Sequence, residues 1–133
     1  MHARPWLIAG IGCRQGCTLA ELQGLLMQAL AMAGACPEDL QGIATFERRV
    51  DAPGLAALAA DLGLPLAGYS AAALAPFEHL LTHRSAVSWR HTGCHGVAES
   101  AALAHCHTLH MQPGRLLLGR QCSRHATVAL AAT

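Results

Sequence analysis

The sequence predicts a single α/β domain with a mixed, largely parallel sheet. Three times in succession, a short apolar run bounded by turn residues is followed by a segment with apolar residues at helical spacing. This alternation is typical of parallel strands connected by helices that cover the sheet. Two apolar runs near the C-terminus predict a hairpin, and 133 residues are enough for one hydrophobic core.

The first strand is expected at residues 5–11, an apolar run that ends in glycines, as in strands buried on both faces. Thr18 and Glu21 then match a capping box, in which the side chain of each residue accepts a hydrogen bond from the backbone N–H of the other. Leucines and alanines continue at helical spacing as far as Gly34, which predicts a left-handed helix end.

A second strand and helix are expected from residue 42 to residue 63. Residues 42–47 form an apolar run, and Asp51 is expected to cap a helix with Pro53 in its first turn. The helix has leucines on one face and stops at Gly63.

A third strand is expected at residues 65–69, with Ser70 capping a third helix that extends to about Leu81. Residues 82–95 lose this pattern and are interpreted as a loop, with a short strand as an alternative. Helical spacing resumes at residues 97–110.

The terminal hairpin is expected to pair residues 115–119 with residues 126–131. Arg120 and Arg124 would then lie in the loop between the two strands. An antiparallel hairpin beside parallel strands makes the predicted sheet mixed.

The composition excludes several classes of protein. The net charge is only +1, whereas nucleic-acid-binding domains are usually clearly basic. No apolar stretch reaches the length of a membrane span or resembles a secretion signal, so a cytoplasmic protein without a membrane partner is expected. Charged residues make up only 13% of the chain, which would suit a homo-oligomer.

The positive charge comes from nine arginines and no lysine. Codon bias explains this choice without any function. In either case, each cation is a planar guanidinium suited to carboxylate or phosphate groups.

The six cysteines lack the compact spacing of a disulfide framework and are expected to be reduced thiols packed as small hydrophobic residues. Cys13 lies beside Arg14 and ahead of a helix, but the sequence ties no base to it, so we interpret it as a packed thiol rather than a nucleophile.

The strongest candidate site is the glycine-rich turn Gly10–Gly16, between the first strand and the first helix. Such a turn directs backbone N–H groups and the positive end of a helix dipole at one point, which suits an anion. Gly16 falls one residue late for the dinucleotide fingerprint, so no NAD or FAD cofactor is expected. A purely structural turn remains an alternative, and Arg14 favours a carboxylate ligand.

The nine histidines do not form a recognisable metal site, and no metal is expected. The spacing of His105 and His107 places them on different helix faces, and His91 and His95 fall in the expected loop. Structural or surface roles are therefore favoured, with an axial histidine for a metal-bearing macrocycle as an alternative. The acids Glu47, Asp51 and Glu99 lie near expected element ends, where capping and surface roles explain them.

Several segments, taken in order, resemble the CobE/CbiG C-terminal domain family of cobalamin (vitamin B12) biosynthesis. The likeness covers nearly the whole chain, and the order and spacing of the segments make it specific. The matching segments are residues 10–16, 44–49, 53–59, 62–66, 92–93, 97–103, 115–120 and 127–130.

The resemblance implies that residues 1–133 form one three-layer α/β/α domain of the corrin pathway. In CbiG the full protein opens a lactone of a cobalt-precorrin, but this chain matches only the C-terminal part. The family pattern has lysine at Arg49 and Arg120, glutamate at Ala52, valine at Cys94 and serine at Gly96. The lost glutamate weakens any acid–base role at Ala52.

The resemblance and the residues agree on one type of ligand. Precorrins are apolar macrocycles fringed with carboxylates, and they need an apolar floor with cations or N–H donors around it. Loops at the carboxyl ends of strands are the usual place for such a site in α/β folds. The expected ligand-binding residues are Gly12, Cys13, Arg14, Gly16, Thr45, Arg49, Thr92, Gly93 and Arg120, with Thr92 and Gly93 at a helix entry.

Three functions therefore follow as hypotheses. The first is an aerobic-pathway protein that binds a precorrin-type tetrapyrrole through arginine and backbone N–H contacts. The second is a hydrolase or isomerase of a precorrin, with Glu47 or Glu99 as acid or base. The third is a non-catalytic partner of another corrin-pathway enzyme.

Overall fold

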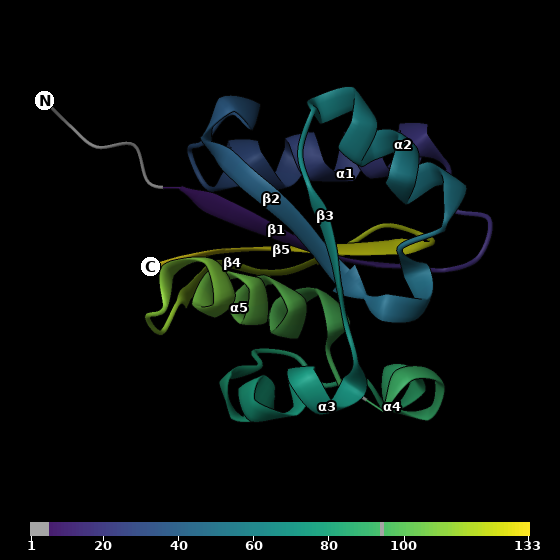
Figure 1. Cartoon of the computed structure of the whole chain (residues 1–133). Coiled ribbons are helices and arrows are strands. Elements are labelled where there is room, and N and C mark those ends of the chain that lie inside the picture. The colour runs from purple at the N-terminus through teal and green to yellow at the C-terminus, as the bar shows by residue number, and fades with distance from the viewer. Residues whose placement is uncertain (1–5, 94) are drawn as a thin grey trace, which may run out of the picture.

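The computed structural model describes residues 6–93 and 95–133 and has an α/β/α architecture (Figure 1). Its five strands form one sheet in the order β3-β2-β1-β5-β4. The strands are β1 (Leu7–Cys13), β2 (Leu40–Phe46), β3 (Leu66–Tyr69), β4 (Arg115–Cys122) and β5 (Ala126–Ala132). The helices are α1 (Leu19–Met32), α2 (Pro53–Leu62), α3 (Ala71–Leu74), α4 (Ala86–Thr92) and α5 (Val97–His110), with 3-10 turns η1 (Pro37–Asp39), η2 (Glu47–Arg49) and η3 (Ala75–Leu80).

The sheet is mixed, as the sequence predicts. Strands β1, β2 and β3 run parallel, whereas β5 is antiparallel to both β1 and β4. At the centre of the sheet, Gly10 lies opposite Ala44 on one side and Ala129 on the other. The two C-terminal strands form the expected hairpin, but Arg120 lies within β4 and not in the connecting loop.

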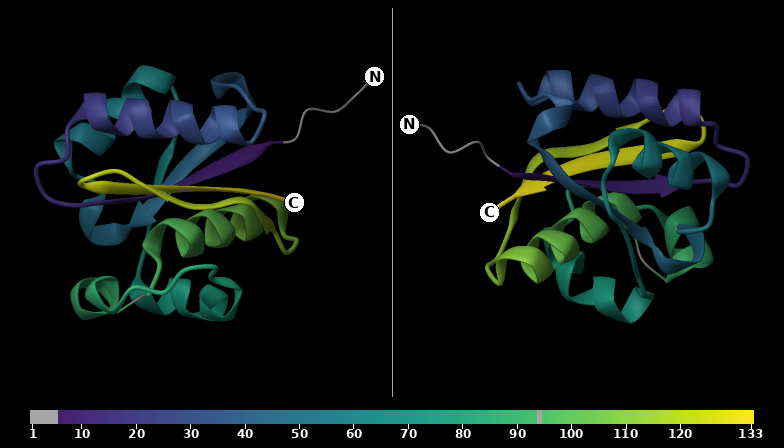
Figure 2. Two further views of the ribbon diagram at one scale, coloured as in Figure 1. Left: turned by 180° about the vertical axis from the view of Figure 1, so that it is seen from behind. Right: turned by 45° about the horizontal axis from the view of Figure 1, so that its top comes forward.

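Helices cover both faces of the sheet, which confirms the three layers. Helices α1 and α2 pack on one face, and α5 lies along the other, with α3 and α4 beyond it (Figures 1 and 2). Helix α5 approaches β1 very closely, since a Cβ atom added to Gly10 would lie 1.8 Å from the carbonyl oxygen of Ala98. None of the helices in the described ranges combines the length and the apolar character needed to cross a lipid bilayer.

Helix α1 confirms only half of the expected capping box. The Thr18 hydroxyl accepts a 3.1 Å hydrogen bond from the backbone N–H of Glu21, and Gly34 adopts a left-handed φ of 69° after the helix. The Glu21 carboxylate does not return to Thr18, because it binds Ser123 and His125 at the β4–β5 turn instead. The long-range contact replaces the local one.

Helix α2 begins one residue later than a cap by Asp51 would require. Its N-cap is Ala52, which offers no side-chain acceptor, so the Asp51 cap is wrong. Pro53 does begin the helix, and Gly63 ends it with a left-handed φ of 65°, both as expected.

The region after β3 differs most from expectation. Ser70 caps a helix as predicted, but α3 ends at Leu74 and continues only as the 3-10 turn η3. Pro76 explains the change, because its ring nitrogen cannot donate the helical hydrogen bond. The expected loop at 82–95 contains α4, which Ser85 caps through the N–H of Ser88 and which Gly93 ends.

Candidate functional site

A pocket of about 390 Å³ opens at the carboxyl edge of β1 and β2, where α/β folds usually bind ligands. Its floor comes from the end of β1, the start of β5 and the first turn of α5, and its walls from α4 and the β4–β5 turn. We call it the arginine pocket. Its residues are Gly12, Cys13, Arg14, Phe46, Arg49, Ser85, Val87, Ser88, Thr92, His95, Gly96, Val97, Ala98, Glu99, Arg120, Cys122, Ser123, Arg124, His125, Ala126 and Thr127.

Four arginines from separate parts of the chain line this pocket. Arg14 follows β1, Arg49 ends the η2 turn after β2, Arg120 lies in β4, and Arg124 lies in the β4–β5 turn. None of these four arginines forms an ion pair with a carboxylate among the described residues. The arginine ion pair that those residues do contain joins Arg84 to Glu78, and neither of these two residues lines the pocket. The buried Nε of Arg120 also has no hydrogen-bond partner. The pocket therefore has spare donors and positive charge.

Glu99 is an acid in this pocket, but its carboxylate is fully engaged. It is 1% exposed and accepts hydrogen bonds from the backbone N–H groups of Thr82 (2.8 Å), Arg120 (2.9 Å) and His83 (3.3 Å), and from the Thr82 hydroxyl. Burial acts to raise the pKa of Glu99, but these hydrogen bonds outweigh it and lower the pKa below its ordinary value. Glu99 therefore holds the wall of the pocket.

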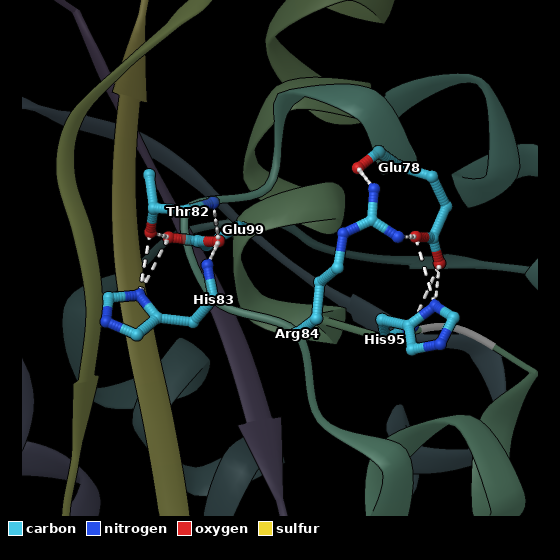
Figure 3. A network of polar contacts seen from close by, with 6 residues as sticks. All are labelled: Glu78, Thr82, His83, Arg84, His95 and Glu99. Carbon is cyan, nitrogen blue, oxygen red and sulfur yellow. Dashed lines mark hydrogen bonds and ion pairs between the residues drawn. The ribbon is translucent and has the colours of Figure 1, made fainter.

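A second carboxylate organises the neighbouring wall, as Figure 3 shows. Glu78 accepts from the backbone N–H of His95 at 2.9 Å, lies 3.1 Å from its ring Nδ1, and pairs with Arg84 at 3.3 Å. The His95 ring stacks on Trp89 of α4 with 4.8 Å between ring centroids. These contacts join η3, α4 and the start of α5 beside the pocket.

The β4–β5 turn is fixed in the same way by Glu21 of α1. The Glu21 carboxylate accepts from the Ser123 hydroxyl, from the backbone N–H of His125 at 2.7 Å, and lies 2.8 Å from His125 Nδ1. The Ser123 hydrogen bond, followed by those from His125, lowers the pKa of Glu21 to about 2. On the other side, the His125 carbonyl accepts from the backbone N–H of Arg14 at 2.8 Å.

Cys13 lies on the pocket floor with 8% of its surface exposed. Burial raises the pKa of its thiol, and the Coulombic effect of Arg49 opposes this only in part. A protonated thiol is a poor nucleophile, which agrees with the packed thiol that the sequence favours. Cys17 and Cys106 are also buried, but Cys36 and Cys122 are exposed, so the expectation of packing is wrong for those two. Cys94 lies outside the described residues.

The structure brings most of the predicted binding residues together. Gly12, Cys13, Arg14, Arg49, Thr92 and Arg120 all line the arginine pocket. Gly16 has the positive φ of a tight turn, 85°, and lines a second hollow that shares Arg14 and Arg49 with the pocket. We call this second opening the side hollow.

Other predicted residues lie elsewhere. Thr45 is fully buried and donates a 2.6 Å hydrogen bond to the carbonyl of Ile11. Gly93 ends α4 with a φ of 74°, so Thr92 and Gly93 mark a helix end, and the expected helix entry is wrong. Glu47 is exposed at the start of η2 and does not line the pocket.

His95, Arg124 and His125 also line the pocket, although they are not among the binding residues predicted from the sequence. No local pattern marks His95 and His125, because their places depend on contacts with Glu78 of η3 and Glu21 of α1 that are remote in sequence. The described residues contain no cluster of three or more side chains that could hold a metal ion. The side chain of His91 lies outside the part of the chain that the structure describes. His105 is buried and bonded to Tyr69, whereas His107 is exposed, so the two face different ways as predicted.

The fold and the pocket define an α/β protein with an arginine-lined pocket at the carboxyl edge of its sheet. The family model described as cobalamin synthesis G C-terminus matches residues 7–131. The chain belongs to this CobE/CbiG C-terminal domain family of cobalamin biosynthesis.

Individual relatives agree with this assignment. The chain is 38% identical to Protein CobE of Sinorhizobium sp. over 94% of its own length and 79% of that protein. It is 27% identical to cobalt-precorrin-5A hydrolase of Priestia megaterium, but it spans only 33% of that enzyme.

Solved structures give the same result. The crystal structure of CobE, a protein from the cobalamin biosynthetic pathway, matches with a TM-score of 0.94 and 38% identity over 100% of this chain and 94% of that chain. The cobalamin biosynthesis protein chiG from Agrobacterium tumefaciens matches with a TM-score of 0.73 and 27% identity, over 96% of this chain and 98% of that chain.

Proposed function

We propose that the arginine pocket binds a precorrin-type tetrapyrrole of the aerobic corrin pathway. The observation that carries this proposal is the convergence of Arg14, Arg49, Arg120 and Arg124 on one pocket without acid partners among the described residues. Arg49 and Arg120 are half-buried, whereas Arg14 and Arg124 are exposed. Guanidinium groups bind carboxylates through charge-assisted, often bidentate hydrogen bonds. A macrocycle fringed with carboxylates supplies the missing acids.

The shape of the site supports an edge-on arrangement. The arginine pocket, at about 390 Å³, is near the small end of ligand pockets, so it would take one edge of the macrocycle and leave the rest outside. The side hollow continues past Arg14 and Arg49 toward Arg48 and would receive carboxylate arms next to that edge. Val87 and Phe46 add apolar surface at the pocket wall.

Backbone N–H groups have a smaller part in this proposal than the sequence suggests. In the glycine-rich turn, the N–H of Arg14 already donates to the carbonyl of His125. Just after the turn, the N–H of Cys17 donates to the carbonyl of Arg14. The arginine side chains therefore provide the main contacts to the ligand.

The occupied carboxylate of Glu99 argues against the enzymatic alternative in which Glu99 is the acid or base. An acid–base group needs a free lone pair or proton at the reacting atom, and the hydrogen bonds to Glu99 hold it in place as a structural group. Glu47 lies outside the pocket.

The proposal is tested by absorbance titration of the purified protein with hydrogenobyrinic acid, a metal-free corrin with carboxylate arms. Saturable binding with an unchanged ligand mass supports a binding protein. Binding accompanied by a new mass would establish turnover and favour the enzyme. No binding at high micromolar ligand would overturn the proposal and favour a protein partner of another pathway enzyme.

A further inference from the structure

His95 places an aromatic ring in the wall of the arginine pocket, and several contacts fix the orientation of that ring. Its backbone N–H donates to Glu78 at 2.9 Å, and its Nδ1 lies 3.1 Å from both carboxylate oxygens of Glu78 (Figure 3). The Trp89 ring of α4 stacks on the His95 ring, with 4.8 Å between ring centroids and 16° between ring planes. An acid therefore holds one edge of the imidazole, and a larger ring backs one of its faces.

The other face of the His95 ring is left uncovered. The side chain is 31% exposed, although Trp89 lies on one face and Glu78 holds the Nδ1 edge. The surface that His95 contributes to the pocket therefore comes from the opposite face and the remaining edge. The face of an aromatic ring stacks on flat, conjugated groups. It complements the guanidinium groups of the pocket, which bind carboxylates.

Helix α4 also exposes large apolar side chains beside the pocket. Val87 lines the pocket and is 44% exposed, and Trp89 is 50% exposed. Exposed apolar surface next to a pocket is typical of a ligand-binding site. The pocket volume of about 390 Å³ accommodates one edge of a tetrapyrrole, so the rest of the macrocycle needs a surface at the pocket mouth. His95 and α4 provide such a surface.

We propose that the His95 ring, backed by Trp89, is a stacking platform for the conjugated macrocycle of the metal-free tetrapyrrole. This inference rests on the proposed function and extends it, because it adds a second requirement for the ligand. Carboxylates alone satisfy the arginines, whereas the platform selects a flat conjugated ring system next to those carboxylates. His95 contacts the ligand, and Trp89 and Glu78 are positioning residues that keep its ring in place.

Other histidine–aromatic pairs do not offer this geometry. Among the described residues, the Tyr69–His105 and Phe77–His107 pairs meet edge to face, and none of their members lines the arginine pocket. His125 does line the pocket, but its ring is held by the Glu21 carboxylate and the described residues place no aromatic ring against it. The stacked pair of His95 and Trp89 is therefore the one suited to a platform.

The test compares two substitutions that both remove the Nδ1 contact with Glu78. H95A also removes the ring and should weaken hydrogenobyrinic acid binding by about 10-fold, whereas H95F keeps a stacking ring and should stay within about 2-fold of the wild type. W89A should weaken binding by about 5-fold, and W89F should restore most of that loss. W6A is the matched control, since Trp6 is exposed and does not line the pocket.

A second ligand separates stacking from damage to the pocket wall. Tricarballylate, an ion with three carboxylates and no ring, should compete with hydrogenobyrinic acid through the arginines alone. Its inhibition constant should therefore be the same in the wild type, H95A and W89A. Parallel losses for both ligands would show that His95 only supports the wall, and they would overturn the platform.

The remaining outcomes separate this inference from the proposed function. An unchanged affinity of H95A for hydrogenobyrinic acid, or equal losses in H95A and H95F, would overturn the platform and leave tetrapyrrole binding in place. Failure of hydrogenobyrinic acid to bind the wild-type protein would overturn the proposed function and the platform with it.

Discussion

The carboxylate of Glu99 accepts a 2.9 Å hydrogen bond from the backbone N–H of Arg120, which ties the first turn of α5 to strand β4. The same carboxylate holds the N–H groups of Thr82 and His83, so one buried acid joins three segments of the pocket wall. A residue that the sequence offers as an acid–base candidate is thus a structural anchor, and its loss has consequences for both folding and ligand binding.

Glu99→Gln should lower the free energy of unfolding by about 2 kcal/mol, because the amide nitrogen cannot accept hydrogen bonds from backbone donors that stay buried. It should also weaken hydrogenobyrinic acid binding, since Arg120 loses its support. Urea denaturation and absorbance titration measure the two effects. Glu47→Gln is the control, because Glu47 is exposed outside the pocket and should change neither. If Glu99→Gln kept the wild-type free energy of unfolding, the structural role of Glu99 would be refuted.

Arg14→Ala and Arg120→Ala should each weaken binding of hydrogenobyrinic acid by about 10-fold, the loss expected for one charge-assisted contact. Higher salt should weaken binding to the unaltered protein more than to either variant. Arg115→Ala removes an exposed arginine of β4 that does not line the pocket, and its affinity should stay unchanged. Equal losses in all three variants would indicate a general charge effect and no specific pocket.

Gly10→Ala should lower the free energy of unfolding by about 3 kcal/mol or prevent folding, because the new Cβ would overlap the Ala98 carbonyl oxygen and separate α5 from β1.

Gly24→Ala should have the opposite effect and raise the free energy of unfolding. Gly24 is exposed within α1 with open space around it, and alanine should stabilise the helix by about 0.5–1 kcal/mol. Both values can be measured by urea denaturation, and a well-tolerated Gly10→Ala would contradict the close packing.

His105 should make folding stability depend on pH. Burial, with a smaller effect of His110, lowers the pKa of His105 in the folded protein. The unfolded chain takes up the proton near pH 6.5, whereas the folded chain resists it, so stability should fall as the pH drops below about 6.5.

The measurement is urea denaturation from about pH 7.5 to about pH 5. His105→Gln should flatten this part of the pH dependence, whereas His107→Gln should leave it unchanged because His107 is exposed. A wild-type slope that survives in His105→Gln would assign the titration to a different group.

Periodicity and end signals predicted much of the fold. Helix α5 begins at Val97 and ends at His110 as expected, because its pattern of small apolar residues is local and long enough to read. Helix α4 was missed because it is short and mostly polar. Its cap at Ser85 and its glycine end at Gly93 were the available signals.

The sequence by itself determined the order of the strands and of the helices other than α4, the mixed sheet and the arginines available for a carboxylate ligand. These depend on side-chain spacing and turn chemistry within a few residues. Only the tertiary structure decided which arginines meet, that Glu21 abandons its own helix cap for His125, and that Glu99 supports Arg120. Such contacts join residues that are far apart in the chain, and local patterns carry no information about which of several competing partners a side chain will bind.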